Sequence, residues 1–431
     1  MNDMAAPAGE YAFKDARFAQ SALQTQLRYK GLSAISRYQP ILSLAHRRPV
    51  GFEALVGVSD QQGAPGAPGQ LFGLGAELGE LVELDRACRE LHLANFASQD
   101  PANCWLFLNV DPRVAAEGRQ FGPFFAQALA RHGYPAARVV IEFTESRMAD
   151  EEMLGSAVRY YRELGCLVAI DDFGAGESNF SRIWRLKPDI VKLDRSTIVA
   201  AAADPATRRM VNGMVALLHE SGALVCVEGI ETDVEARIAI DASADLLQGY
   251  LFARPAPMLA HDADFLPLFE RLIDEFAREI GAESERSRRA LNAYGSQFDA
   301  MALALEGGLP FAQAARGFLA LPAAERCFLL DERGRQIGRN LVSPANRAAF
   351  DLRFAPLYDV GGANWSARHY FRRAMMEPGR IQRTRPYLSL NGPRMCMTFS
   401  VTVRLDGRQQ VLCADVDAGR MDETPWPPAA N

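Results

Sequence analysis

The sequence predicts an α/β protein: an eight-stranded α/β barrel modified by one antiparallel strand, then a long helix and a smaller α+β domain. Two strand patterns near the N-terminus are joined by a link too short for a parallel crossover, and strand and helix patterns then alternate. The last third changes to one long helical pattern followed by hairpin patterns. At 431 residues the chain is too long for one ordinary core, so we expect two or three domains.

Composition argues against several classes of protein. Hydrophobic residues make up 48% of the chain and charged residues 23%, which is typical of a globular protein. The net charge of -6 argues against binding to a nucleic-acid polymer or an anionic membrane surface. The 7 cysteines are scattered and lie mostly in apolar runs, which favours reduced core residues. Because no leader or membrane-spanning pattern is visible, we expect a cytoplasmic protein.

The first elements are an N-terminal extension over residues 1–31 and a pair of strands. Phe18, Leu23 and Leu27 predict a short helix in the extension. Apolar residues then predict two antiparallel strands, over residues 34–44 and 49–58.

Six further strand patterns follow, and each carries a polar residue at or near its end. These residues are Asn109, Glu142, Asp171, Lys192, Glu228 and Gln248. Helical patterns lie between the strands, for example over residues 81–96, 153–164 and 207–221. Repeated strand-helix units with nearly continuous apolar strands indicate a parallel fold, and their number favours a TIM-type barrel over a doubly wound sheet.

Such barrels place their chemistry at the C-terminal ends of the strands. The antiparallel first strand brings an early residue, Gln39, to the same mouth as Glu53 of the second strand. One rim is therefore expected to collect Gln39, Glu53, Asn109, Glu142, Asp171, Asp172, Lys192, Glu228 and Gln248.

The residue types on this rim predict bound cations. Five or more carboxylates without balancing arginines stay ionised in a cleft only if cations are bound there. The ligands are all oxygen, so Mg²⁺ or Mn²⁺ is expected rather than zinc. Asp171 and Asp172 suggest a two-metal site of the kind used in phosphodiester hydrolysis. Lys192 either orients or deprotonates the attacking water, or only offsets the acids.

The motifs in this order resemble the EAL family of cyclic di-GMP phosphodiesterases. One is the triplet Glu53-Ala54-Leu55, which gives the family its name. The others are YQPI at Tyr38, FLNVDP around Asn109, IEFTE from Ile141, AIDDFGAG from Ala169, KLD at Lys192, VEGIE from Val227 and LQGYLFARP from Leu247. The resemblance covers about residues 34–257 and implies a barrel with one antiparallel strand. It also implies hydrolysis of cyclic di-GMP to linear pGpG.

The resemblance implies a role for each matching position. Metal ligands are expected at Glu53, Asn109, Glu142, Asp171, Asp172 and Glu228, with Asp171 shared by both ions. Glu53 and Lys192 are expected to be catalytic, with Glu145 anchoring the loop after Asp172 and Glu231 as a supporting acid. Gln39, Leu55 and Gln248 are expected near the substrate.

One position departs from the family pattern. The family usually continues the triplet with one residue and an arginine that meets a ligand phosphate, whereas this chain has Val56 and Gly57. Losing a charge-assisted phosphate contact costs on the order of 1.5–3 kcal/mol of binding.

The C-terminal third predicts a second folding region. An apolar stripe from Phe265 to Ile280 continues as Leu291, Tyr294, Phe298, Met301 and Leu305, at the spacing of a coiled-coil seam; the same helix would equally pack on its own barrel. Hairpins are expected within residues 327–338 and around Asp406-Gly407. This region resembles the PAS-like or Cache-like sensor domains that follow some EAL domains. Trp365, Arg368, Tyr370 and Asp415 either line a small-ligand pocket or are core aromatics and a strand cap.

We therefore expect a barrel over residues 32–260, a connecting helix over 261–318, a sensor domain over 319–420 and a tail over 421–431. The expected protein is a homodimeric phosphodiesterase regulated by its C-terminal domain, where an unknown small ligand or protein binds. Two alternatives stay open: a receptor that binds cyclic di-GMP without turnover, and an interaction protein with a vestigial barrel.

Overall fold

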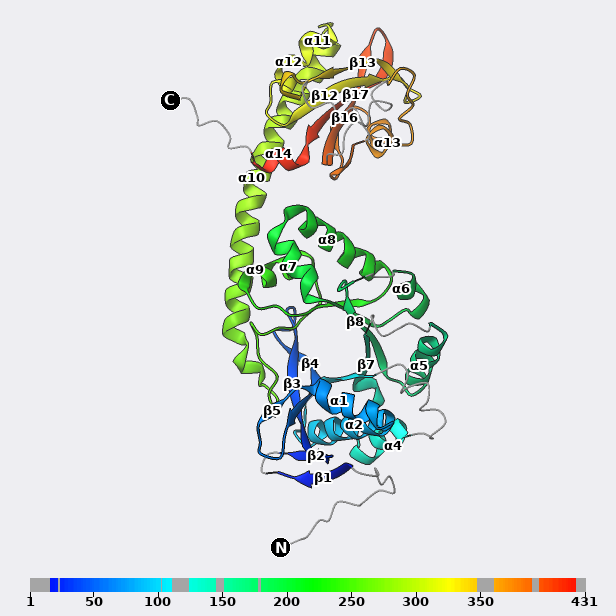
Figure 1. The fold of residues 1–431 in the computed structure, drawn as a ribbon. Helices are drawn as coiled ribbons and strands as arrows, with labels where there is room; N and C mark the ends of the chain where they lie inside the picture. Colours follow the sequence, from blue (N-terminus) through cyan, green and yellow to red (C-terminus); the bar gives the residue numbers. More distant parts are fainter. Residues whose placement is uncertain are drawn as a thin grey trace. The chain divides into compact units, whose positions relative to one another are not determined.

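The computed structural model describes residues 16–21, 24–101, 103–110, 124–144, 151–176, 180–346, 360–389 and 395–423 (Figure 1). The chain divides into two compact units, Met1–Phe276 and Ala277–Asn431. Over the described residues, no helix combines the length and the apolar character needed to cross a membrane.

The first unit contains a closed barrel of eight strands. They are β3 (Leu32–Ser43), β4 (Arg48–Ser59), β6 (Trp105–Asn109), β7 (Val139–Thr144), β8 (Leu167–Phe173), β9 (Ile190–Leu193), β10 (Leu224–Val227) and β11 (Leu246–Leu247). Strand β3 pairs antiparallel with both β4 and β11 and so closes the barrel, while the other neighbours are parallel. The predicted barrel with one antiparallel strand is confirmed.

Strands extend the barrel sheet beyond β3 and β4. The hairpin β1 (Ala16–Gln20) and β2 (Thr25–Tyr29) continues from β3, and the short β5 (Pro65–Gly66) pairs with β4. The short helix predicted around Phe18 and Leu27 is therefore wrong. Leu27 and Tyr29 are buried and Arg28 between them is exposed, which is the alternation of a strand rather than of a helix.

Helices follow most of the barrel strands, and Figure 1 shows α5 to α8 outside them. They are α1 (Pro68–Glu77), α2 (Leu81–Ala97), α4 (Phe124–His132), α5 (Glu151–Glu163), α6 (Phe180–Leu186), α7 (Arg195–Ala203), α8 (Pro205–Glu220) and α9 (Asp233–Asp241). Polar caps fix several starts: Asp204 accepts hydrogen bonds from the first-turn amides of α8, and Thr232 forms a capping box with Glu235 on α9.

The second unit is built on an antiparallel sheet in the order β13-β12-β17-β16-β14, with β15 also paired to β16. Its strands are β12 (Ala324–Leu330), β13 (Gln336–Val342), β14 (Gln382–Arg383), β15 (Tyr387–Leu388), β16 (Met395–Leu405) and β17 (Arg408–Asp417). Its short helices are α11 (Phe311–Ala314), α12 (Arg316–Leu319), α13 (His369–Met376) and α14 (Ala418–Glu423). Both predicted hairpins are confirmed.

Helix α10 (Leu266–Glu306) contributes to a core in each unit. Phe269 and Leu272 are buried in the first unit, where Leu272 joins the main barrel core. Tyr294, Phe298, Met301 and Leu305 are buried in the core of the second unit, beside Phe318 and Phe399 of that unit. Of the two alternatives left open for this helix, packing on its own chain is the one observed: Phe269 and Leu272 pack on the barrel as expected, and Tyr294 to Leu305 pack on the sheet of the second unit.

Candidate functional site

A layer of side chains inside the barrel lies directly below the predicted site. It contains one residue from each of seven strands: Ile41, Phe107, Val140, Ala169, Ile190, Cys226 and Leu246. In β4 the corresponding position is Gly51, where a Cβ would lie 2.6 Å from the ring of Phe107. Side chains two residues apart on a strand share a face. The next inward layer therefore contains Gln39, Glu53, Asn109, Glu142, Asp171, Lys192, Glu228 and Gln248.

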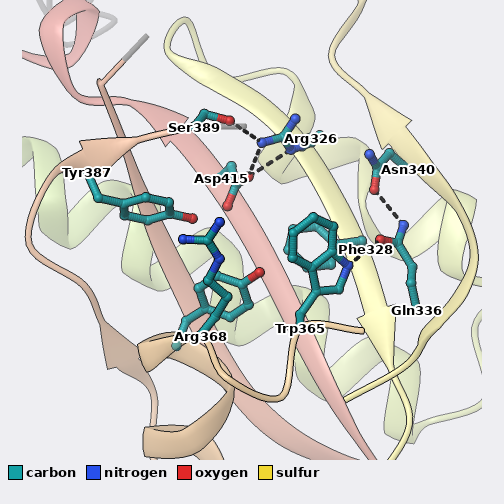
Figure 2. Close-up of a pocket in the computed structure, with 10 residues that line it drawn as sticks. Arg326, Phe328, Gln336, Asn340, Trp365, Arg368, Tyr387, Ser389 and Asp415 are labelled. Carbon is teal, nitrogen blue, oxygen red and sulfur yellow. Dashed lines mark hydrogen bonds and ion pairs between the residues drawn. The ribbon is translucent and has the colours of Figure 1, made fainter. Parts of the chain in front are cut away.

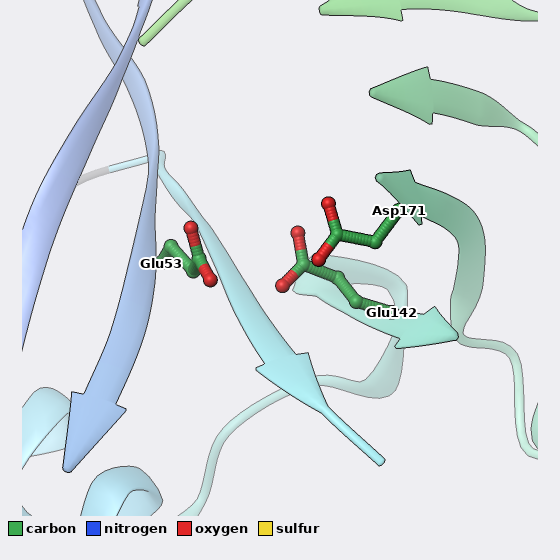
Figure 3. Close-up of side chains that lie close together, drawn as sticks. All are labelled: Glu53, Glu142 and Asp171. Atoms are coloured by element: carbon green, nitrogen blue, oxygen red, sulfur yellow. The ribbon is translucent and has the colours of Figure 1, made fainter. Parts of the chain in front are cut away.

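Three carboxylates from separate strands converge in this layer. Figure 3 shows Glu53 from β4, Glu142 from β7 and Asp171 from β8 pointing toward one another. One oxygen from each lies within 4.8 Å of the others, and all three residues are buried. A second group with the same spacing contains Asp171, Asp172 and Glu228. The two groups share Asp171, so the geometry is suited to two neighbouring cations.

The backbone at Asp172 explains how two adjacent acids serve one site. Neighbouring residues of a regular strand point to opposite faces. Asp172 has φ of 56°, in the left-handed region, and the pairing of β8 with β9 shifts register between Ile170 and Phe173. This irregularity lets a carboxylate oxygen of Asp172 approach Asp171 and Glu228 within the same 4.8 Å limit.

Lys192 lies at the centre of the acids. Its fully buried Nζ is 2.7 Å from Glu142, 3.3 Å from both Glu53 and Asp171, and also pairs with Glu228. Burial lowers the pKa of Lys192, but the four carboxylates outweigh burial and raise it well above its ordinary value. These ion pairs partly offset the charge of the acids, and the role of Lys192 toward water stays a prediction.

Three amide side chains complete the buried layer. Asn109 Nδ2 donates to Glu53 at 2.9 Å and to Glu142 at 3.1 Å. Gln248 Nε2 donates to Glu53 at 2.8 Å and to Gln39 at 3.2 Å, and Gln39 itself donates to the carbonyl of Ala253. These bonds hold the Glu53 carboxylate in one orientation.

The electrostatics of the acids fit the binding of additional cations. Burial, followed by repulsion from the other acids, raises the pKa of Glu142 well above its ordinary value, even though Lys192 acts in the opposite direction. Burial likewise raises the pKa of Glu228 well above its ordinary value, and that of Asp172 to a smaller extent. One ammonium does not balance five acids, and an all-oxygen donor set suits hard divalent ions. The residues present thus fit the expected metal site.

Two other predicted residues lie apart from these acids or outside the described residues. The exposed Glu231 forms a two-pronged ion pair with Arg195, with one contact of 2.7 Å, and belongs to neither carboxylate group. Glu145 lies outside the described residues.

A cavity of about 340 Å³ adjoins the buried layer. Leu55 and Asn109 line it, as do side chains of α1 and α2, including Phe72 and His92. It also contains a residue that the sequence analysis passed over, Arg37 of β3. A signal was available, because Arg37 precedes Gln39 by two residues and must share its face.

The second unit contains a small pocket lined by all four residues predicted there. Trp365, Arg368, Tyr370 and Asp415 line it together with Arg326, Phe328, Gln336, Asn340, Tyr387 and Ser389 (Figure 2). Its volume of about 20 Å³ has room for about one water molecule. Asp415 lies inside β17 rather than capping it, and Tyr370 is also a core residue.

Most polar groups of this pocket are already paired. Arg326 donates to Asp415 at 2.7 Å and to Ser389 at 2.7 Å, and Thr398 donates to the other oxygen of Asp415. Trp365 donates to Gln336 at 2.9 Å. Within the described part of the chain, the guanidinium of Arg368 has no hydrogen bond or ion pair, and Figure 2 shows it pointing toward the space beside Asp415.

Comparisons with known proteins identify the first unit. The family model described as the EAL domain matches residues 20–255. The cyclic di-GMP phosphodiesterase NbdA of Pseudomonas aeruginosa is 29% identical over 265 residues, which cover 59% of this chain and 31% of NbdA. The signaling protein YkoW of Bacillus subtilis is 26% identical over 52% of this chain and 28% of its own length. The matched part of this chain thus spans about a third of these relatives.

Solved structures share the fold, one of them over a longer stretch. The YkuI protein of Bacillus subtilis, which has an EAL domain and was solved with cyclic di-GMP and calcium, matches with a TM-score of 0.74 at 22% identity. The match covers 89% of this chain and 96% of YkuI. A manganese and cyclic di-GMP complex of BlrP1 from Klebsiella pneumoniae matches with a TM-score of 0.50 at 24% identity, over 57% of this chain and 60% of BlrP1.

Proposed function

The chain belongs to the EAL domain family, and from that premise we propose that it hydrolyses one phosphodiester bond of cyclic di-GMP to give linear pGpG. The observation that carries the proposal is the pair of carboxylate groups that share Asp171. Two divalent ions, Mg²⁺ or Mn²⁺, are the cations that this donor set would hold. Relatives support the substrate, because NbdA is named a cyclic di-GMP phosphodiesterase and YkuI was solved with that nucleotide.

In this mechanism Glu53, Asn109, Glu142 and Asp171 would hold the first ion, and Asp171, Asp172 and Glu228 would hold the second. When bound by these residues, the ions would supply Lewis-acid polarisation of the phosphate. Lys192 keeps its proton beside the acids and orients the attacking water by donating a hydrogen bond. Asn109 and Gln248 hold Glu53 in place through the bonds described above.

Glu231 and Glu145 keep supporting roles in the proposal. Arg195, the first residue of α7, holds the exposed Glu231 in an ion pair, and it follows Lys192 closely in sequence. Leu55 lines the cavity and Gln39 lies in the buried layer beside Gln248, and both are proposed to contact the nucleotide.

The proposal is tested by turnover of the purified chain. With Mn²⁺ and cyclic di-GMP, the protein should form pGpG, and Glu53→Ala or Lys192→Ala should abolish that product. Arg208→Ala, which changes an exposed arginine of α8, is the matched control and should retain activity. Absence of product with either metal across a range of pH would refute the enzyme proposal.

A receptor without turnover is the second candidate, and Gly57 is the observation that favours it. The family arginine is missing at this position, so its charge-assisted hydrogen bonds to a ligand phosphate are lost. Calorimetry would then show tight binding of cyclic di-GMP without pGpG in the same sample, whereas product formation would exclude it.

For the second unit we propose a PAS-like or Cache-like sensor domain, over residues 319–420, that regulates a cytoplasmic homodimer. A small ligand that meets Arg368 is the proposed signal; because the Trp365 pocket of about 20 Å³ has room for about one water molecule, the ligand would have to widen it. If the unit regulates the barrel, Arg368→Ala should change the rate of pGpG formation without changing the melting temperature. An unchanged rate, with Arg372→Ala on the following helix α13 as control, would argue against regulation through this pocket.

A further inference from the structure

Arg37 occupies the space above Gly57. Gly57 lies two residues after Leu55 on β4, and Arg37 lies on the neighbouring strand β3. A Cβ at position 57 would lie 2.7 Å from Nε and 3.1 Å from Cδ of Arg37, closer than side-chain carbons normally come to other atoms. The side chain of Arg37 therefore rests in this position only because residue 57 is glycine.

Strand register places both residues on the face that leads into the site. Gln39 pairs with Glu53, Arg37 with Leu55, and Ile35 with Gly57. Directly opposed residues of an antiparallel pair share a face, and so do residues two apart on one strand. Arg37 and Gly57 thus extend the row that contains the buried Gln39 and Glu53, farther out from the barrel interior.

Charge also singles out Arg37. The other arginine of the same cavity, Arg89, is held by Asp85 at 2.6 Å and by the hydroxyl of Tyr161 at 2.8 Å. Lys192 is surrounded by four carboxylates. Arg37 is exposed, and no ion pair or hydrogen bond engages its guanidinium within the described residues. It is thus the cation of this cavity that is available to an anionic ligand.

We propose that Arg37 binds a phosphate of cyclic di-GMP and replaces the arginine that this chain lacks at position 57. The positive charge has moved from β4 to β3, and the glycine makes room for it. Exposed guanidinium groups bind phosphate through paired, charge-assisted hydrogen bonds. This inference rests on the proposed function, since it names a substrate-positioning residue for the same nucleotide.

The test combines single and reciprocal substitutions in the full chain. Arg37→Ala should raise the dissociation constant for cyclic di-GMP roughly tenfold to a hundredfold, the usual loss for charge-assisted hydrogen bonds. Binding is measured by calorimetry with calcium, the ion of the YkuI complex, and KM and kcat are measured with Mn²⁺. The loss should fall mainly on KM. Arg37→Lys, which keeps the charge but not the paired donors, should lie between.

The double variant Arg37→Ala with Gly57→Arg is the decisive measurement. It returns a guanidinium to the same face from β4 and should recover most of the lost affinity, which a folding defect would not allow. Arg208→Ala is the matched control and should bind as the wild type does.

The outcomes separate the inference from the proposed function. If the wild type binds and hydrolyses the nucleotide but Arg37→Ala stays within twofold of it, the inference is overturned and the function stands. If the double variant recovers no affinity, the replacement of position 57 by Arg37 is likewise overturned. If the wild type neither binds nor hydrolyses cyclic di-GMP, both proposals fall.

Discussion

At the scale of single residues, a few unusual environments assemble the candidate site. Asp172 adopts a left-handed backbone conformation, and Lys192 is fully buried among acids. Both are costly on their own: a non-glycine residue in this conformation costs roughly 1 kcal/mol, and several buried acids repel one another. Such costly conformations and charges are found mainly at functional sites, where binding or catalysis requires them.

Substitutions at Asp172 distinguish two requirements of this position: the left-handed backbone conformation and the negative charge. Asparagine tolerates the left-handed conformation and removes a charge that the neighbouring acids repel, so Asp172→Asn should melt at or above the wild-type temperature without metal but lose most of the stabilisation that Mn²⁺ gives. Asp172→Ala should also lose about 1 kcal/mol of unfolding free energy without metal. Thermal melting with and without Mn²⁺ measures both effects. Equal stabilisation of Asp172→Asn and the wild type would contradict a metal ligand at this position.

His92 of α2 predicts a pH dependence of stability. Burial lowers its pKa from 6.5 to about 4, and its Nδ1 lies 2.9 Å from the hydroxyl of Ser36. Below pH 6.5 the unfolded chain takes up a proton that the folded chain refuses, so stability is complete above pH 6.5 and falls as the pH drops toward 4. The slope from this residue is about 1.4 kcal/mol per pH unit.

Urea unfolding at pH 7 and pH 5 tests this dependence. The wild type should lose about 2 kcal/mol more than His92→Gln between these pH values. His369→Gln, which changes an exposed histidine of α13, is the control and should lose as much as the wild type. The same loss in His92→Gln and the wild type would show that His92 does not titrate in this way.

At the scale of elements, strands β3 and β4 and helix α10 make contacts that their local sequence patterns do not specify. Strands β3 and β4 pair over their whole length, which extends the row containing Glu53 outward to Gly57. Helix α10 buries different stripes in the two units. In each case the residue pattern along the chain is regular, and the neighbouring segment of the same chain determines what the patterned face contacts.

The buried stripe of α10 predicts that replacing Phe298 lowers the stability of the second unit strongly. Phe298 is fully buried and its ring lies 5.8 Å from that of Phe399 and 6.0 Å from that of Phe318. Phe298→Ala should therefore destabilise the second unit by about 3–5 kcal/mol in urea unfolding. Leu303→Ala on the exposed face of the same helix is the control. If Phe298 instead formed a seam between chains, the variant would change the oligomeric state in sedimentation and leave the unfolding of the second unit unaffected.

At the scale of the whole molecule, the chain holds separate cores. The main barrel core draws on the strands and helices of the first unit, and the core around Phe318 draws on the sheet and α10 of the second. The candidate metal site lies entirely in the first unit. Events that stabilise one core therefore need not stabilise the other.

Calorimetry of the full chain should accordingly show two unfolding transitions. Mn²⁺ at a hundred times its dissociation constant should raise the barrel transition by the equivalent of about 2.7 kcal/mol for each ion bound and leave the other in place. Phe298→Ala should lower only the transition that Mn²⁺ does not move. A single transition that responds to both changes would show that the two cores unfold together.

The sequence by itself determined the barrel and the kinds of residue at its mouth. Period-two alternation is local, so the spacing from Ile190 to Lys192, or from Val140 to Glu142, already assigns each pair to one inward face. The short link before β4 likewise required an antiparallel pair. The roles of these residues in metal binding and catalysis stay predictions.

Only the tertiary structure determined which side chains those faces contact. The register shift in β8 brings Asp172 to Asp171, the glycine on β4 admits Arg37 from β3, and the second sheet covers the stripe ending at Leu305. The pocket of the second unit joins Trp365 to residues such as Arg326 that are distant in sequence. Each of these contacts depends on a pairing between remote segments, and local periodicity contains no information about which segments pair.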